Sequence, residues 1–253
     1  MAAGLLKYYT YCNVLRVDWG RGSFPSRDLA FANTKVVGGE IAFFINTLIK
    51  EFNFTASQAH CIGHSLGSYV CGFCGQGVEN LGWITALDIS DRGNLTNDQK
   101  LDPSDARFVD CIHTDIRRTG LFKNLGNPNP HGHIDIYPNG GYGQPKCEFS
   151  LLKALIPDFK NLLDPVVNQA YCNHFRAIHY YNESIWNPSC EWKAYECSDY
   201  ETFLQPDQCK SCGADNTKCA FLGLRAIEYP DKSRKNVKFY MKTKDQPPFC
   251  PQP

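Results

Sequence analysis

An alternation of extended and helical patterns in the first third of the chain constrains its fold most strongly. Residues 13–19 (NVLRVDW) are rich in β-formers, and apolar residues then recur at helical spacing from about 26 to 52. A short apolar strand over 59–63, a helix to about 77 and a strand over 83–88 follow. Strands that alternate with helices pair in parallel, so this order predicts an α/β fold with a mostly parallel sheet and helices on both faces.

Regular patterning weakens in the second half of the chain. Residues 109–114 and 133–137 predict two further strands, whereas the segment from Pro188 onward is rich in Cys, Asp and Pro. This last segment is typical of a loop-rich flank that disulfides hold together. No repeat or linker divides the 253 residues, so we expect one domain over 1–253.

The cysteines and charges limit the compartment and the partners. Thirteen cysteines favour an oxidising compartment, and three glycosylation sequons agree with it, at Asn53, Asn94 and Asn182. The formal net charge is zero, so the chain has no basic field to bind a nucleic acid. The cysteines therefore predict a secreted protein, but the first residues lack the pattern of a signal peptide. We expect the natural start of the protein to lie before residue 1.

A G-x-S-x-G pentapeptide, Gly63 to Gly67, stands between an apolar strand and a helix. Glycines beside a serine permit a strained turn that exposes the hydroxyl, and the following helix N-terminus offers N–H groups to an oxyanion. This context favours Ser65 as a nucleophile over an ordinary glycine-rich turn. Catalysis by serine also needs a histidine base that a carboxylate orients.

The residues alone leave the partners of Ser65 open. Asp88 ends the next strand at the sheet edge where Ser65 emerges, which makes it the natural acid, and Asp91 is a close competitor. Five histidines remain possible as the base: His113, His131, His133, His174 and His179.

Five segments in order, GHSLG, LD, RFVDCIHTD, NLGNPNPHGHIDIYPNGG and CNHFRAIHYY, resemble the animal pancreatic-type lipase and phospholipase A1 family over almost the whole chain. The resemblance implies an α/β-hydrolase fold, with Ser65 as nucleophile, Asp88 as acid and His174 as base. It also implies that the backbone N–H of Leu66 receives the oxyanion. Acyl transfer of this kind needs no organic cofactor.

The segment LDPSD places two carboxylates three residues apart in a turn, where they can offer hard oxygens to a cation. The resemblance implies a structural calcium held by the side chains of Asp102 and Asp105 and the carbonyls of Lys100 and Asn97. The alternative is a helix N-terminus that Asp102 or Ser104 caps.

An apolar stripe interrupted by prolines lies between Cys147 and Cys172, and a disulfide joining these ends would tether it as an amphipathic flap. The resemblance implies that this segment, about 147–172, is a lid over the serine. The alternative is an ordinary core helix. A lid of full length favours a triacylglycerol lipase over a phospholipase A1.

The remaining cysteines are assigned mainly through the resemblance, which implies the pairs Cys197–Cys209 and Cys212–Cys219. A zinc site is the weaker alternative, because one C-x-x-C lacks a second pair. Cys190 and Cys250 are candidates for a C-terminal staple. We expect three cysteines near the nucleophile to be buried packing residues: Cys61, Cys71 and Cys74. The pairing of Cys12 and Cys111 stays open.

The chain also departs from the family. It begins late, so we expect the first strands and the second oxyanion donor to be missing, and the turn after Asp88 lacks the usual proline. It stops near Cys250 without a β-sandwich domain, as in invertebrate single-domain relatives, so no colipase-like partner is expected.

The leading hypothesis is a secreted lipase acting on neutral lipid at an oil–water or membrane interface. The alternatives are a phospholipase A1 and a catalytically impaired lipid-binding or storage protein.

Overall fold

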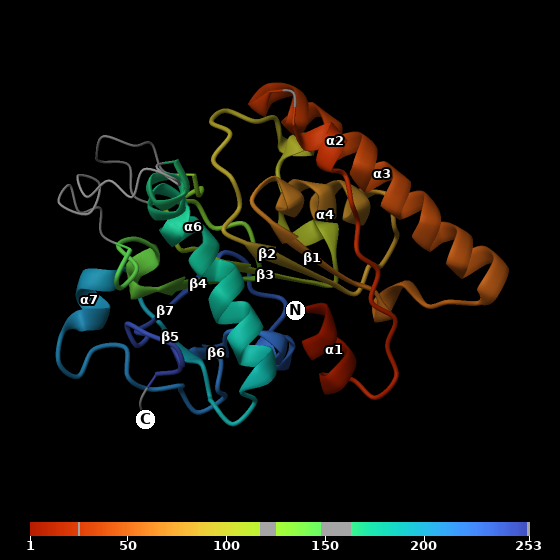
Figure 1. Ribbon diagram of the computed structural model, residues 1–253. Coiled ribbons are helices and arrows are strands. Elements are labelled where there is room, and N and C mark those ends of the chain that lie inside the picture. Colours follow the sequence, from red (N-terminus) through yellow and green to blue (C-terminus); the bar gives the residue numbers. More distant parts are fainter. Residues whose placement is uncertain (25, 117–124, 148–162, 252–253) are drawn as a thin grey trace.

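The computed structural model describes residues 1–24, 26–116, 125–147 and 163–251 (Figure 1). Within these residues, seven strands form one sheet in the order β1-β2-β3-β4-β7-β5-β6. The five strands from β1 to β7 in this order are parallel, β5 pairs antiparallel with β7, and β6 pairs antiparallel with β5. The strands span His60–His64 (β1), Trp83–Leu87 (β2), Phe108–Ile112 (β3), Ile134–Pro138 (β4), Lys193–Glu196 (β5), Cys219–Phe221 (β6) and Val237–Met241 (β7).

Helices cover both faces of this sheet (Figure 1). The α-helices span Ala2–Tyr8 (α1), Gly20–Ser23 (α2), Arg27–Phe52 (α3), Leu66–Gln76 (α4), Leu163–Trp186 (α6) and Tyr200–Leu204 (α7). Short 3₁₀ turns span Ala56–Gln58 (η1), Asn97–Gln99 (η2), Pro103–Asp105 (η3), Asn139–Gly141 (η4) and Leu224–Glu228 (η5). No helix among the described residues is both long and apolar enough to cross a bilayer.

The alternation of side chains along β2 divides the interior into two hydrophobic cores. Ile84 and Ala86 belong to the core that α3 and α4 cover, whereas Trp83 and Leu87 belong to the core on the α6 face. Successive residues of a strand point to opposite faces, so a strand buried on both sides is apolar throughout. The predicted α/β-hydrolase fold, with helices on both faces, is confirmed.

The predicted strand over 13–19 is wrong. Residues 12–19 have no regular secondary structure, and Leu15 and Val17 are 62% and 49% exposed. β-Propensity forms a strand only where a paired neighbour and a buried face are available. The first strand is instead β1, at the edge of the sheet.

Local signals define the long helix α3. The Ser26 hydroxyl accepts a hydrogen bond from the Leu29 N–H at 3.2 Å and so caps the first turn. Asn53 ends the helix in the left-handed conformation, with φ of 54°. α3 then packs closely on α4, since a Cβ at Gly38 would lie 2.6 Å from the Phe73 Cβ.

Five disulfides cross-link the chain: Cys61–Cys71, Cys147–Cys172, Cys190–Cys250, Cys197–Cys209 and Cys212–Cys219. The expected C-terminal pairs and the staple to Cys250 are confirmed. The expectation of simple packing residues is wrong for Cys61 and Cys71, which form a disulfide because β1 and α4 lie side by side with the two Cα atoms 5.6 Å apart. It holds for Cys74, whose thiol is buried and free.

Replacing Cys61 and Cys71 together by alanine tests the bond across the turn that carries Ser65. The loss of this short cross-link should lower the free energy of unfolding by about 3 kcal/mol, because the unfolded chain regains loop entropy. Urea unfolding at neutral pH measures the change. Cys74→Ala, on the same helix, is the control and should show only a packing loss. An equal loss in both proteins would contradict a cross-linking role.

Candidate active site

Ser65 occupies a sharp turn between β1 and α4. Its φ and ψ are 56° and −120°, a backbone conformation that residues other than glycine rarely adopt. Gly63 permits the turn, because a Cβ there would lie 2.2 Å from the Gly67 carbonyl oxygen, whereas a Cβ on Gly67 would meet nothing within 4 Å. The backbone N–H of Ser65 donates to the Leu87 carbonyl at 3.0 Å. The first glycine of the pentapeptide is therefore the one that sterics require.

Asp88 follows β2 directly and is fully buried. Its Oδ1 accepts hydrogen bonds from the backbone N–H groups of Thr114, at 2.7 Å, and Asp115, at 3.1 Å. Its Oδ2 accepts a hydrogen bond from His174 Nδ1 at 2.6 Å. Two amides and one imidazole thus fix the carboxylate and compensate for its loss of water.

The structure brings Asp88 rather than Asp91 to the histidine. The Asp91 carboxylate accepts from the N–H of Gly93 at 3.1 Å, within its own turn. Its backbone carbonyl accepts from Arg27 Nη2 at 2.6 Å. Asp91 therefore bonds to Arg27 through its backbone, and its carboxylate bonds within its own turn.

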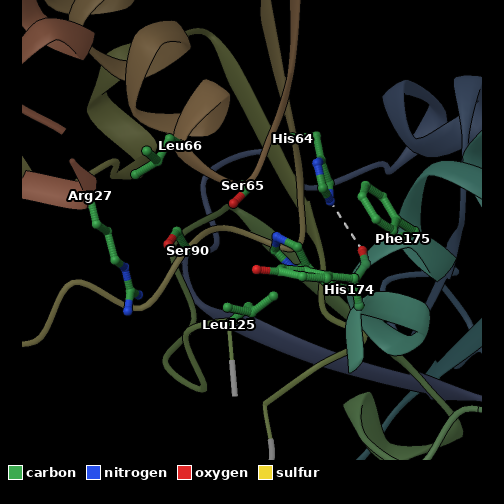
Figure 2. Close-up of a pocket in the computed structure, with 9 residues that line it drawn as sticks. Arg27, His64, Ser65, Leu66, Ser90, Leu125, His174 and Phe175 are labelled. Atoms are coloured by element: carbon green, nitrogen blue, oxygen red, sulfur yellow. Dashed lines mark hydrogen bonds between the residues drawn. The ribbon is translucent and has the colours of Figure 1, made fainter. Parts of the chain in front are cut away.

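Ser65 and His174 line one pocket of about 310 Å³ at the end of the sheet (Figure 2). Leu66, the first residue of α4, lines it as well, so the N-terminus of this helix adjoins the space in front of the serine. The remaining lining residues are Arg27, His64, Ser90, Leu125, Tyr171 and Phe175. A serine, an imidazole, a buried carboxylate and a helix N-terminus together suit acyl transfer.

His64 contacts the backbone of His174, a role that the sequence analysis missed. Its Nε2 donates to the backbone carbonyl of His174 at 3.1 Å, and its ring lies 5.5 Å from that of Phe175 (Figure 2). Burial, followed by the charge of His174, lowers the pKa of His64 to about 4. The position of His64 directly before Ser65 was the available signal.

The other four candidate histidines lie elsewhere. His113 Nε2 lies 2.8 Å from Asp135 Oδ1, and the ring stacks on Tyr137 inside the core. The His131 and His133 rings bond to backbone groups of Leu101 and Val109, and His179 is exposed on α6. Of the five histidines considered from the sequence, His174 alone lines the pocket.

The expected calcium ligands lie on and beside η3, which packs on α4. Asp102 Oδ1 accepts from the backbone N–H and the hydroxyl of Ser104, at 2.7 and 2.6 Å, so the capping geometry considered as the alternative is present. Asp105 is 5% exposed, and its Oδ2 accepts from the N–H of Asp102 at 3.1 Å. Lys100 and Asn97 are exposed on the adjoining turn.

The disulfide Cys147–Cys172 joins the ends of the expected lid. This confirms the tether. Residues 148–162, which form most of that segment, lie outside the described residues, so the lid itself stays a prediction.

Comparison with known proteins gives a consistent match. The family model described as Lipase matches residues 1–249. The chain is 38% identical to pancreatic lipase-related protein 2 of Mus musculus, over 94% of this chain and 49% of that protein. It is 35% identical to mouse pancreatic triacylglycerol lipase, over 94% of the chain and 51% of the relative. It is 36% identical to mouse inactive pancreatic lipase-related protein 1, over 94% and 50%. The chain thus spans about half the length of the curated relatives it matches.

The lowered pKa of His64 makes stability depend on pH. The ordinary value of 6.5 applies to the unfolded chain, which therefore takes up a proton as pH falls from about 6.5 to 4, while folded His64 stays neutral. In this window the free energy of unfolding of the original protein should fall as pH falls, because the unfolded state binds up to one more proton than the folded state. His64→Gln should remove this contribution to the slope, roughly 1.4 kcal/mol per pH unit at most.

Urea unfolding at pH 7, 6 and 5 measures this effect. His179→Gln is the comparison: partial burial also lowers the pKa of His179, but less than that of His64, so this change should flatten the slope less than His64→Gln does. Parallel slopes for the original protein and His64→Gln would show that His64 is not held neutral by the fold.

Proposed function

Since this chain belongs to the lipase family, we propose that it hydrolyses the carboxylic esters of neutral lipids, with triacylglycerol as its preferred substrate. The observation that carries the proposal is the 2.6 Å contact of His174 with buried Asp88, in the pocket that Ser65 lines. The substrate class is supported by the likeness to pancreatic triacylglycerol lipase and by the tethered segment expected to form a lid.

In the proposed mechanism, the three side chains divide the work of one acyl transfer. His174 Nε2 takes the proton of the Ser65 hydroxyl while Oγ attacks the ester carbonyl, and Asp88 stabilises the imidazolium through Nδ1. The N–H of Leu66 receives the oxyanion. His174 then returns the proton to the leaving alcohol, and water, deprotonated by the same imidazole, releases the fatty acid from the serine.

A structural calcium at the turn before β3 forms part of the proposal. The donor set fits a hard cation, because two carboxylates lie close together and Asp105 is buried. The side chains of Asp102 and Asp105 and the carbonyls of Lys100 and Asn97 would hold the ion. It would brace this turn against the nucleophile helix α4, and it would take no part in bond making.

We further propose secretion and glycosylation. The disulfides are consistent with an extracellular protein, and the chain is similar to pancreatic triacylglycerol lipase. Asn53 and Asn94 are exposed and can accept a glycan, whereas Ser184 of the Asn182 sequon is buried and bonded to the Tyr181 carbonyl. The proposed partner is lipid at an interface.

A fluorophosphonate probe and two lipid substrates test the catalytic proposal. Ser65→Ala should abolish labelling, and Asp88→Asn should lower kcat by about 10⁴-fold, because the imidazole loses its orientation. Asp91→Asn is the matched control and should keep most of the activity.

Three outcomes would contradict the proposal. Hydrolysis of phosphatidylcholine vesicles far above that of a triolein emulsion would identify a phospholipase A1. A folded sample that the probe does not label would support a binding or storage protein. Equal losses in Asp88→Asn and Asp91→Asn would remove Asp88 from its assigned role.

Removal of calcium tests the metal proposal. Chelation with EDTA should lower Tm, and added calcium should restore it, since an ion that binds only the folded state stabilises it by mass action. The double variant Asp102→Asn with Asp105→Asn should lose this response. An equal response to EDTA in both proteins, or none in the original, would contradict a site at this turn.

A further inference from the structure

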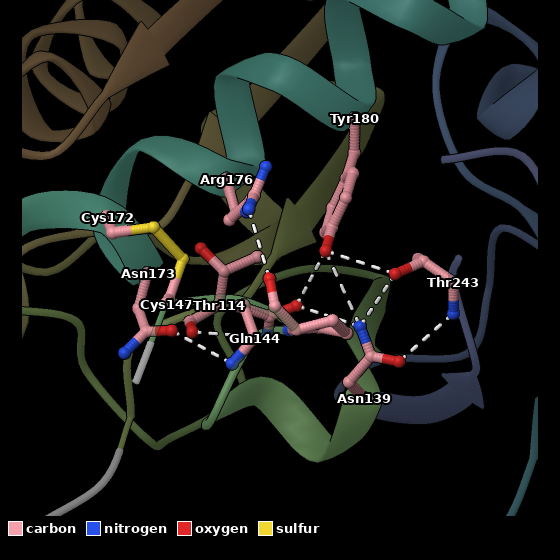
Figure 3. Close-up of a disulfide and its surroundings, with 10 residues drawn as sticks. Thr114, Asn139, Gln144, Cys147, Cys172, Asn173, Arg176, Tyr180 and Thr243 are labelled. Carbon is pink, nitrogen blue, oxygen red and sulfur yellow. Dashed lines mark hydrogen bonds between the residues drawn. A yellow bond between two sulfur atoms is a disulfide. The ribbon is translucent and has the colours of Figure 1, made fainter. Parts of the chain in front are cut away.

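Gln144 is a fully buried glutamine shortly after η4, and both polar atoms of its side-chain amide have hydrogen-bond partners (Figure 3). Its Oε1 accepts from Asn139 Nδ2 and from the Tyr180 hydroxyl, both at 2.9 Å. Its Nε2 donates to the carbonyls of Pro138, at 2.9 Å, and Thr114, at 3.2 Å. Two donors and two acceptor sites are therefore occupied, and this geometry fixes the side chain in one orientation.

One of these bonds leads directly to the acid. The peptide group between Thr114 and Asp115 accepts from Gln144 through its C=O and donates to Asp88 Oδ1 through its N–H, at 3.1 Å. A carbonyl that accepts a hydrogen bond polarises its own peptide, so the N–H becomes a stronger donor. Gln144 therefore both orients and polarises an amide that holds the Asp88 carboxylate.

A second bond leads to the base. The backbone N–H of Gln144 donates to Asn173 Oδ1 at 2.8 Å, and Asn173 directly precedes His174 (Figure 3). Two further links join the same segments: the disulfide Cys147–Cys172 and a bond of 3.0 Å from Arg176 Nη2 to the Pro145 carbonyl. The part of α6 that carries His174 is thus anchored to the segment that carries Gln144.

These contacts close a ring. Gln144 reaches Asp88 through the Thr114–Asp115 peptide, Asp88 holds His174, and His174 adjoins Asn173, which accepts from Gln144. We propose that Gln144 is a positioning residue that keeps the acid and the base of the active site in register. This inference rests on the proposed hydrolase function, and it assigns Gln144 no contact with substrate.

Steady-state kinetics of Gln144→Met provide the first test. Methionine has a similar length but keeps none of the side-chain hydrogen bonds, so Asp88 and His174 should lose their register. We expect kcat to fall about tenfold to a hundredfold while KM changes little, because the substrate pocket is intact. The acid limb of the pH–rate profile should move to lower pH, since the imidazolium is less well stabilised.

Thr243→Val is the matched control. Thr243 Oγ1 contacts Asn139 Nδ2 and the Tyr180 hydroxyl, at 2.8 and 3.1 Å, and both of these groups bond to Gln144 Oε1 rather than to the peptide that holds Asp88. This change should lower Tm but leave kcat and the pH profile near those of the original protein. Equal kinetic losses in Thr243→Val and Gln144→Met would reduce Gln144 to a structural role and overturn the proposal.

Asn173 provides a second pair of variants in case Gln144→Met does not fold. Asn173→Leu removes the acceptor of the Gln144 N–H, whereas Asn173→Asp keeps an oxygen at that place. The leucine variant should lose kcat, and the aspartate variant should recover most of it. Equal activity in both would contradict the link to the base.

The His174 Nδ1 proton gives a readout that does not depend on turnover. Its NMR signal should exchange with solvent faster in Gln144→Met than in Thr243→Val, because the Asp88 contact opens more often. If the original protein shows no esterase activity but the two variants still differ in the exchange rate of this proton, the proposed function is contradicted and the positioning role stays in place. Unchanged exchange and unchanged kcat in folded Gln144→Met would overturn the inference.

Discussion

The site depends on a buried carboxylate whose three hydrogen bonds come from distant parts of the chain. Asp88 accepts from two backbone amides after β3 and from a ring on α6, 86 residues away in sequence. A buried charge is tolerated only where such donors replace water. The parallel order of β1, β2 and β3 meets this demand, because their carboxyl ends emerge at one edge and place Ser65, Asp88 and Thr114 side by side.

Much of this arrangement could be predicted from local patterns. The apolar runs of β2 and β3 identify buried strands, and the glycine before His64 identifies the turn that exposes Ser65. The choice between Asp88 and Asp91 could not be made from the residues alone, because both follow the same strand. The structure separates them, because Asp88 contacts His174 at 2.6 Å whereas the Asp91 carboxylate bonds to the Gly93 N–H.

Other features depend on contacts that no local pattern encodes. The segment over 13–19 has strand propensity but lacks a paired neighbour, so propensity alone gave the wrong result. Cys61 and Cys71 meet because a strand and a helix turn back on each other, and Gln144 belongs to no motif. Such residues become visible only when the partners of each buried polar or sulfur atom are known.

The disulfide between β1 and α4 has a consequence for motion at Ser65. It ties together the two elements that hold Ser65 in its positive-φ conformation, and Gly38 and Phe73 pack α3 closely over the same helix. A strained turn relaxes most easily when its flanking elements fray. Here a covalent bond and a close helix contact both oppose such fraying, so we expect the amide protons of the turn to exchange more slowly than those of loops that no cross-link holds.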